Sequence, residues 1–217
     1  MKILVSGASG FIGRNLIKFL KHLDCEIITI CMFQKDLTSL AMQIEHLENQ
    51  LQKIEPQICD VHTFIHLAWL GTNDWNSSVH KNINTQLSEY LIKRLSSGGI
   101  EHVIVAGTCL EYGVSGKNLS EFLPARPKNE YASAKYALYK SIRIMADKDD
   151  FELSWLRLFY IFGGDQPPTT IYGSLMEHID RGKTTFNMSS GQQVRDYLHI
   201  DTVCQMILAV VMSKQGF

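Results

Sequence analysis

Three glycines near the amino terminus constrain the fold of this chain more than any other feature. Gly7, Gly10 and Gly13 follow a short apolar run at residues 2–5, and a stretch with the apolar spacing of a helix begins directly after them. Glycine allows a tight turn at positive φ and lets other groups approach the backbone closely. The amino end of a helix offers free N–H groups and a partial positive charge to an anion. The spacing therefore predicts a strand, a phosphate-binding turn and a helix, as at the start of dinucleotide-binding folds.

Apolar runs with strand character alternate with helical segments along most of the chain. We predict further strands at about 26–32, 62–67, 102–106 and 153–161, and helices at about 37–54, 87–95 and 129–147. The first of these helices is expected to have Asp36 as its N-cap and to end before Pro56. This alternation is typical of an α/β fold with a Rossmann-type, doubly wound parallel sheet and helices on both of its faces.

The pattern changes after Gly163, where turn-forming residues are frequent and the periodicity is weaker. We therefore predict a dinucleotide-binding domain at residues 1–162 and a C-terminal substrate-binding lobe at residues 163–217. The lobe is expected to contain a returning strand and a helix near Met206.

Composition limits the partners and the chemistry of the chain. The 217 residues carry a formal net charge of -1, which gives no basic surplus for binding nucleic acid. No apolar run approaches the roughly 20 residues that a membrane-spanning helix needs. The five cysteines have no Cys-x-x-Cys spacing, which indicates free thiols rather than a disulfide framework or a zinc site. We accordingly predict a cytoplasmic protein that has no metal site and binds neither nucleic acid nor a membrane.

Tyr131 and Lys135 form a candidate catalytic pair. They lie four residues apart in a predicted helix, so their side chains share one face. A tyrosine hydroxyl has a pKa of about 10, and a nearby ammonium group lowers that pKa because it stabilises the phenolate. Such a spacing is by itself more often surface packing, but here it follows a complete dinucleotide turn. Thr108, directly after a predicted strand, adds a hydroxyl that can reach the same substrate oxygen.

Five segments in order carry a resemblance to a known family. They are residues 7–13 (GASGFIG), 66–68 (HLA), 107–113 (GTCLEYG), the pair Tyr131 and Lys135, and 195–201 (RDYLHID). The sequence resembles the extended short-chain dehydrogenase/reductase family, the NAD-dependent epimerase/dehydratase group that modifies nucleotide-linked sugars. The resemblance extends over nearly the whole chain.

This resemblance implies a role for each segment. Tyr131 would exchange a proton with the sugar oxygen, Lys135 would bind the nicotinamide ribose, and Thr108 would hydrogen-bond to the reacting oxygen. Contacts to the cofactor are implied for Gly7, Ser9, Gly10, Phe11, Ile12, Gly13, Cys31, Leu67 and Ala68, together with Lys135. Tyr160 and Arg195 are implied as substrate contacts, with the Arg195 guanidinium suited to a diphosphate. The resemblance also implies a homodimer.

One departure from the family pattern concerns the choice of cofactor. Cys31 stands where NAD-using members carry an acidic residue at the end of the second strand. A small neutral residue leaves room for a 2′-phosphate, which Lys35 could reach, so this position favours NADP over NAD. The alternative is that Cys31 is simply the buried end of a strand.

Other departures concern the reaction and the substrate. Cys109 and Leu110 stand where the 4,6-dehydratases carry Asp and Glu, so dehydration of that type is disfavoured. Tyr160 replaces an asparagine that contacts the substrate in relatives, which leaves the identity of the sugar open. Relatives continue further than Phe217, so we expect either a truncated chain with an incomplete substrate lobe or a lobe that is minimal.

Three hypotheses follow. The first is an NAD(P)-dependent enzyme that reduces a nucleotide-linked 4-keto sugar, with NADP preferred. The second is a nucleotide-sugar 4-epimerase that keeps NAD bound and returns the hydride. The third belongs to another class: a dinucleotide-binding scaffold or sensor with little activity.

Overall fold

A five-stranded parallel sheet forms the centre of the protein. The computed structural model describes residues 1–113, 119–164 and 166–213. The strands are β1 (Lys2–Ser6), β2 (Glu26–Ile30), β3 (Thr63–His66), β4 (His102–Thr108) and β5 (Glu152–Leu158). They are all parallel and lie in the order β2-β1-β3-β4-β5. The predicted α/β fold is confirmed, and the three central strands β1, β3 and β4 are buried almost throughout, as expected for a parallel sheet covered on both faces.

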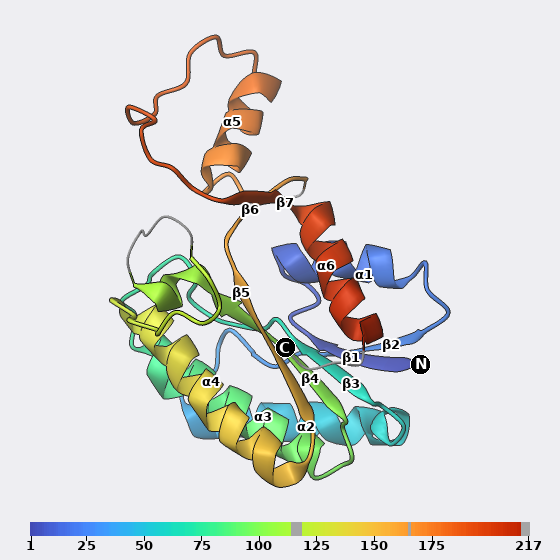
Figure 1. Cartoon of the computed structure of the whole chain (residues 1–217). Helices are drawn as coiled ribbons and strands as arrows, with labels where there is room; N and C mark the ends of the chain where they lie inside the picture. The colour runs from blue at the N-terminus through green and yellow to red at the C-terminus, as the bar shows by residue number, and fades with distance from the viewer. Residues whose placement is uncertain (114–118, 165, 214–217) are drawn as a thin grey trace.

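Helices cover both faces of this sheet (Figure 1). On one face, α1 (Phe11–Leu20) and α6 (Ile200–Ser213) pack on an apolar cluster that includes Ile3 and Val5 of β1. On the other face, α2 (Leu40–Ile58), α3 (Gln86–Ser96) and α4 (Glu130–Asp149) pack on a second cluster that includes Leu4. Successive residues of β1 therefore enter different cores, and the sheet is doubly wound as predicted.

The glycine turn lies where the strand order reverses. β2 and β3 flank β1 on opposite sides, so the connections that leave β1 and β2 diverge at its carboxyl end. In open α/β sheets this switch point is where ligands bind. The backbone N–H of Leu67 donates to the Ser6 carbonyl at 3.1 Å, which brings the end of β3 against the start of the turn.

The helix after β2 differs from the sequence-based expectation at both ends. Its N-cap is Ser39, whose hydroxyl accepts from the Met42 N–H at 3.3 Å, so the prediction of Asp36 as the cap was wrong. Pro56 lies inside α2 rather than after it. It is tolerated because it stands in the last turn, where the helix loses one backbone hydrogen bond close to its end.

The chain leaves the main sheet after Leu158. The predicted strand at 153–161 is two strands, because Phe159 separates β5 from β6 (Tyr160–Phe162). β6 pairs in parallel with β7 (Tyr197–His199) in a separate two-stranded sheet. Between them runs α5 (Ile171–Asp180), a helix in a stretch predicted to be less regular. Figure 1 shows α5 and this small sheet beyond the carboxyl edge of the main sheet.

The returning strand and the C-terminal helix were predicted and are present as β7 and α6. The proposed division at residues 162 and 163 stays a prediction. Residue 165 and residues 214–217 of the second segment lie outside the described residues.

Candidate active site

The glycine turn is built so tightly that side chains are excluded from it. Gly7 has a φ of +77°, and a Cβ there would lie 2.6 Å from the backbone nitrogen of Ala68. A Cβ on Gly13 would overlap the carbonyl oxygen of Gly7. Gly10 is the N-cap of α1 and has no side chain that could occupy the first turn of the helix. These residues fit the pyrophosphate of a dinucleotide, because the first-turn N–H groups and the positive end of α1 face the turn.

Gly13→Ala is expected to abolish dinucleotide binding. The new methyl group must displace the backbone of the turn at Gly7, which moves the N–H groups that hold a phosphate. Calorimetric titration of NADH and a thermal melt would measure the loss. Gly164→Ala is the matched control, because a Cβ there meets nothing within 4 Å. Retention of wild-type affinity by Gly13→Ala would contradict the assignment of the turn.

The other predicted cofactor residues surround this turn. Phe11 and Ile12 begin α1 and are half-buried against the core, and the Ser9 carbonyl accepts from Arg14 at 2.7 Å. Cys31 follows β2 and is exposed, with its thiol donating to the Phe33 carbonyl at 3.3 Å. The alternative that Cys31 is a buried strand end is therefore wrong.

A pocket of about 150 Å³ lies at the carboxyl ends of β4 and β5. It joins Thr108, Tyr131 and Tyr160, three residues that the sequence predicts for the site but that belong to three separate elements. Its remaining walls come from Thr72, Trp75, Cys109, Leu110, Leu158 and Phe159. The hydroxyls of Thr108 and Tyr131 can therefore approach one substrate atom from two sides.

Local structure fixes the position of Tyr131. Asn129 caps α4 by accepting from the Ala132 N–H at 2.8 Å. The N–H of Tyr131 itself donates to the Trp75 carbonyl at 2.9 Å. These bonds place the tyrosine in the first turn of α4, against the wall of the pocket.

Burial controls the protonation of Tyr131. It raises the pKa of the hydroxyl to about 12, a hydrogen bond with Thr108 offsets part of the rise, and the negative charge of Glu111 adds to it. The sequence-based expectation that Lys135 lowers this pKa is wrong for the chain by itself, because desolvation outweighs every other influence. At neutral pH Tyr131 therefore keeps its proton and is a proton donor.

Lys135 lies one helical turn beyond Tyr131, beneath the surface. Its ammonium donates to the Ala106 carbonyl at 2.7 Å and sits 3.8 Å from the centre of the Trp69 ring. Burial lowers the pKa of Lys135 to about 7, against the opposing charge of Glu111. Trp69, which follows the 66–68 segment, therefore contacts the lysine directly.

His80 fixes the orientation of the Trp69 ring through a hydrogen bond. The indole N–H donates to Nδ1 of His80 at 3.1 Å, and Nε2 of His80 bonds to the Asp74 carbonyl at 2.7 Å. His80 is fully buried at the start of η1 (His80–Thr85), a turn of π-helix that leads into α3. This irregular turn was not predicted, and it supplies the side chain that orients the Trp69 ring.

The two predicted substrate residues lie together. The Arg195 guanidinium carbon is 5.3 Å from the centre of the Tyr160 ring, where β6 and β7 run side by side. Burial raises the pKa of the Cys109 thiol, while the positive charge of Arg195 acts in the opposite direction. Arg195 is thus close enough to the pocket to influence a group on its wall.

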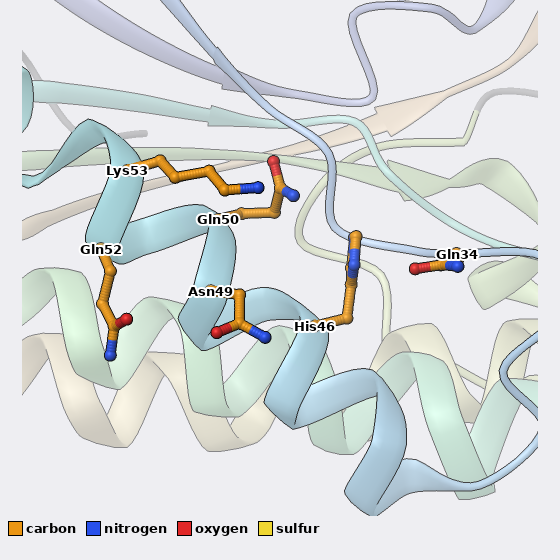
Figure 2. A pocket seen from close by; sticks show the side chains of 6 residues that line it. All are labelled: Gln34, His46, Asn49, Gln50, Gln52 and Lys53. Atoms are coloured by element: carbon orange, nitrogen blue, oxygen red, sulfur yellow. The ribbon is translucent and has the colours of Figure 1, made fainter.

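A larger hollow of about 480 Å³ lies along α2, away from these residues (Figure 2). Its lining is polar and consists of Gln34, His46, Asn49, Gln50, Gln52 and Lys53. His46 bonds to the Cys31 carbonyl at 3.2 Å. None of the predicted catalytic side chains lines this groove, so we assign the chemistry to the smaller pocket.

The part of the chain that the structure describes contains neither a cluster of metal ligands nor a membrane-spanning helix. Among residues 1–113, 119–164 and 166–213, no group of three or more His, Cys, Asp or Glu side chains could hold a metal ion. In the same part of the chain, no helix has the length and apolar character needed to cross a membrane.

Comparison with known proteins fixes the family. The model of the NAD dependent epimerase/dehydratase family matches residues 3–216. The chain belongs to that family. The resemblance inferred from the sequence is therefore confirmed, as is the prediction of a dinucleotide-dependent enzyme of the epimerase/dehydratase group.

Several members of the epimerase/dehydratase family are similar to this chain. The dTDP-6-deoxy-L-talose 4-dehydrogenase (NAD(+)) of Aggregatibacter actinomycetemcomitans is 25% identical over 231 residues, which cover 100% of this chain and 82% of the relative. An uncharacterised UDP-glucose epimerase of Bacillus subtilis (strain 168) is 25% identical, covering 97% and 72% of the two chains. The crystal structure of UDP-glucuronic acid 4-epimerase from Bacillus cereus with UDP-glucuronic acid and NAD has a TM-score of 0.78 at 21% identity, covering 100% and 74%. This last likeness shows the fold.

Proposed function

We propose that this protein is an NAD-dependent oxidoreductase that acts on carbon 4 of a nucleotide-linked sugar, in the direction of 4-keto sugar reduction or its reverse. The observation that carries the proposal is the pocket that Thr108 and Tyr131 line together, with Lys135 one helical turn beyond Tyr131. The dehydrogenase from A. actinomycetemcomitans, similar over the full length of this chain, is named for the same reaction type.

Different residues of the chain donate the proton, stabilise the reacting oxygen and bind the cofactor and the substrate. When bound, NAD supplies or accepts hydride at the reacting carbon. In the reductive direction Tyr131 donates its hydroxyl proton to the oxygen on that carbon, and the phenolate regains a proton from solvent. Thr108 hydrogen-bonds to the same oxygen and stabilises its developing charge. Lys135 holds the adjacent ribose, and Arg195 binds the diphosphate of the substrate as a guanidinium fork.

We propose NAD rather than NADP as the cofactor. The preference for NADP was inferred from the small neutral Cys31 and from Lys35 within reach of a 2′-phosphate, and the similar proteins do not support it. The A. actinomycetemcomitans enzyme is named for NAD(+), and the B. cereus epimerase was crystallised with NAD. We further propose a nucleotide-linked sugar as the substrate and a homodimer as the working unit.

A 4-epimerase is the second candidate. The Bacillus subtilis relative is named as an epimerase, and both reactions need the same proton donor and the same hydride exchange at one carbon. The difference lies in whether the keto intermediate leaves or is reduced again from its other face.

Cofactor titration followed by an assay tests the proposal. NADH and NADPH are titrated separately by calorimetry, and we expect tighter binding of NADH. NADH oxidation is then followed with a dTDP-linked 4-keto-6-deoxy sugar, and the reverse reaction with the corresponding alcohol. Net oxidation of NADH supports the oxidoreductase. Conversion of a nucleotide sugar to its 4-epimer without net change in NADH supports the epimerase. Binding of a dinucleotide without either activity would favour the scaffold hypothesis, and binding of neither cofactor would contradict both candidates.

A further inference from the structure

A carboxylate lies completely buried directly behind the proposed catalytic threonine. Glu111 belongs to η2 (Cys109–Tyr112), a single 3-10 turn that follows β4, and its side chain has no exposure to solvent. Removing a carboxylate from water costs several kcal/mol unless other groups compensate it closely. No part of the proposed reaction uses this residue.

Two side chains of β5 and the backbone N–H of Thr108 at the end of β4 donate hydrogen bonds to the Glu111 carboxylate. Arg157 Nε donates to Oε2 at 3.0 Å, and the Trp155 indole N–H lies 3.1 Å from both oxygens. These two residues alternate along β5 and therefore project from the same face of the sheet. A Cβ on Gly107 would overlap the indole nitrogen, so glycine at that position leaves the space in which this cluster forms.

The remaining contact of Glu111 is to the catalytic segment itself. Its Oε1 accepts from the backbone N–H of Thr108 at 2.8 Å, while the Thr108 hydroxyl accepts from the Leu110 N–H at 3.3 Å. The Thr108 side chain also accepts from the backbone N–H of Glu111, which together with the bond from the Thr108 N–H to the Glu111 carboxylate forms a reciprocal capping box. The backbone of Thr108 is therefore fixed by a charged group that is itself held by Arg157.

We propose that Glu111 is a positioning residue, which together with Arg157 and Trp155 fixes the Thr108 hydroxyl in the geometry that the reaction needs. The inference rests on the proposed function. Buried ion pairs contribute little net stability compared with apolar packing, so the burial of this pair is better explained by the geometry that it imposes. A hydroxyl that stabilises charge in the transition state loses its effect when it is displaced by a fraction of an ångström.

Glu111→Gln is the first variant to test. The amide keeps the shape of the side chain but replaces one acceptor oxygen with a donor, so it cannot satisfy both Arg157 and Thr108. We expect kcat to fall at least about tenfold while KM for the nucleotide sugar stays within about twofold, because the lost interaction serves the transition state. Glu48→Gln is the matched control: Glu48 pairs with Arg94 at 3.6 Å and accepts from the Tyr90 hydroxyl at 2.6 Å, outside the pocket.

A double-mutant cycle separates positioning from a general loss of structure. If Glu111 acts through Thr108, then Glu111→Gln changes kcat by less than about twofold once Thr108→Val is already present. If the fold-decrease in kcat of the double variant equals the product of the decreases in Glu111→Gln and Thr108→Val, the proposal is overturned. If Glu111→Gln does not fold, as judged by its thermal melt, the same cycle is measured with Trp155→Phe, which removes one donor and leaves the Arg157 pair intact.

The wild-type assay distinguishes failure of the proposed function from failure of the positioning role of Glu111. If the wild-type chain binds a dinucleotide but gives neither oxidoreductase nor epimerase activity, the proposed function fails and the positioning role falls with it. If the wild type is active and the cycle is additive, only the positioning role is overturned.

Discussion

Tyr131→Phe is expected to lower turnover by about three orders of magnitude while the affinity for NADH stays within about twofold. The variant removes only the Tyr131 hydroxyl, and Tyr131 lines the pocket together with Thr108. Because the pKa of this hydroxyl is raised to about 12, it carries its proton throughout the neutral range and is ready to protonate the substrate oxygen. Turnover is measured from NADH oxidation and affinity by calorimetry.

The control for this variant comes from the same helix. Tyr136→Phe changes a ring that stacks on Tyr139 at 6.1 Å and does not line the pocket, so turnover should stay within about twofold of the wild type. Substantial turnover by Tyr131→Phe would show that another group donates the proton and would overturn the mechanism.

Lys135→Met is expected to stabilise the fold while abolishing activity. The lysine holds its charge in a fully buried site, with one hydrogen bond to Ala106 and the ring of Trp69 as its compensation. Methionine fills a similar volume without a charge, and we expect a gain of about 2 kcal/mol in the free energy of unfolding at pH 6. Activity should fall more than about a hundredfold, because Lys135 is proposed to bind the ribose.

The stability difference should depend on pH in a defined direction. Burial lowers the pKa of Lys135 from 10.5 to about 7, so between these values the unfolded chain holds a proton that the folded chain has released. Stability of the wild type therefore rises with pH in this window, by up to about 1.4 kcal/mol per unit. Below pH 7 both states are protonated and the folded state bears the full cost of the buried charge.

Thermal melts at pH 6 and pH 9 measure this effect. The gain in the free energy of unfolding of Lys135→Met relative to the wild type should be smaller at pH 9 than at pH 6. Lys140→Met, at an exposed position on the same helix, should change stability by less than about 0.5 kcal/mol at either pH. A Lys135→Met variant less stable than the wild type at pH 6 would show that the contacts of the ammonium outweigh its desolvation.

The sequence was sufficient for the parts of the fold that depend on local pattern. The strand-turn-helix at Gly7 and Gly13 could be predicted because a close backbone approach leaves glycine as the residue that fits. Helix α5 was missed although Ile171, Leu175 and Ile179 recur every four residues. These side chains are partly or largely exposed, so the periodicity does not correspond to a buried core.

Features that depend on contacts between distant segments could not be predicted. The spacing of Thr108 and Glu111 is a local capping pattern, but the partners that hold the buried carboxylate, Trp155 and Arg157, follow 44 and 46 residues later in the chain. The direction of the pKa shift of Tyr131 depends on how deeply α4 buries the ring, which the spacing to Lys135 does not report. The spacing identified the pair, and the surroundings determine its protonation.

The pairing of β6 with β7 has a consequence for how such an enzyme can diversify. The segment between the two strands, which includes α5, leaves and re-enters the protein at one point, because the strands lie side by side. Beyond that point, α6 returns to the core and packs against α1. The segment is thus an insertion that joins the rest of the protein only through the adjacent strands β6 and β7. Thr108 and Tyr131 lie outside this segment, so we expect its exchange to change the proposed sugar preference while leaving the proposed proton donor in place.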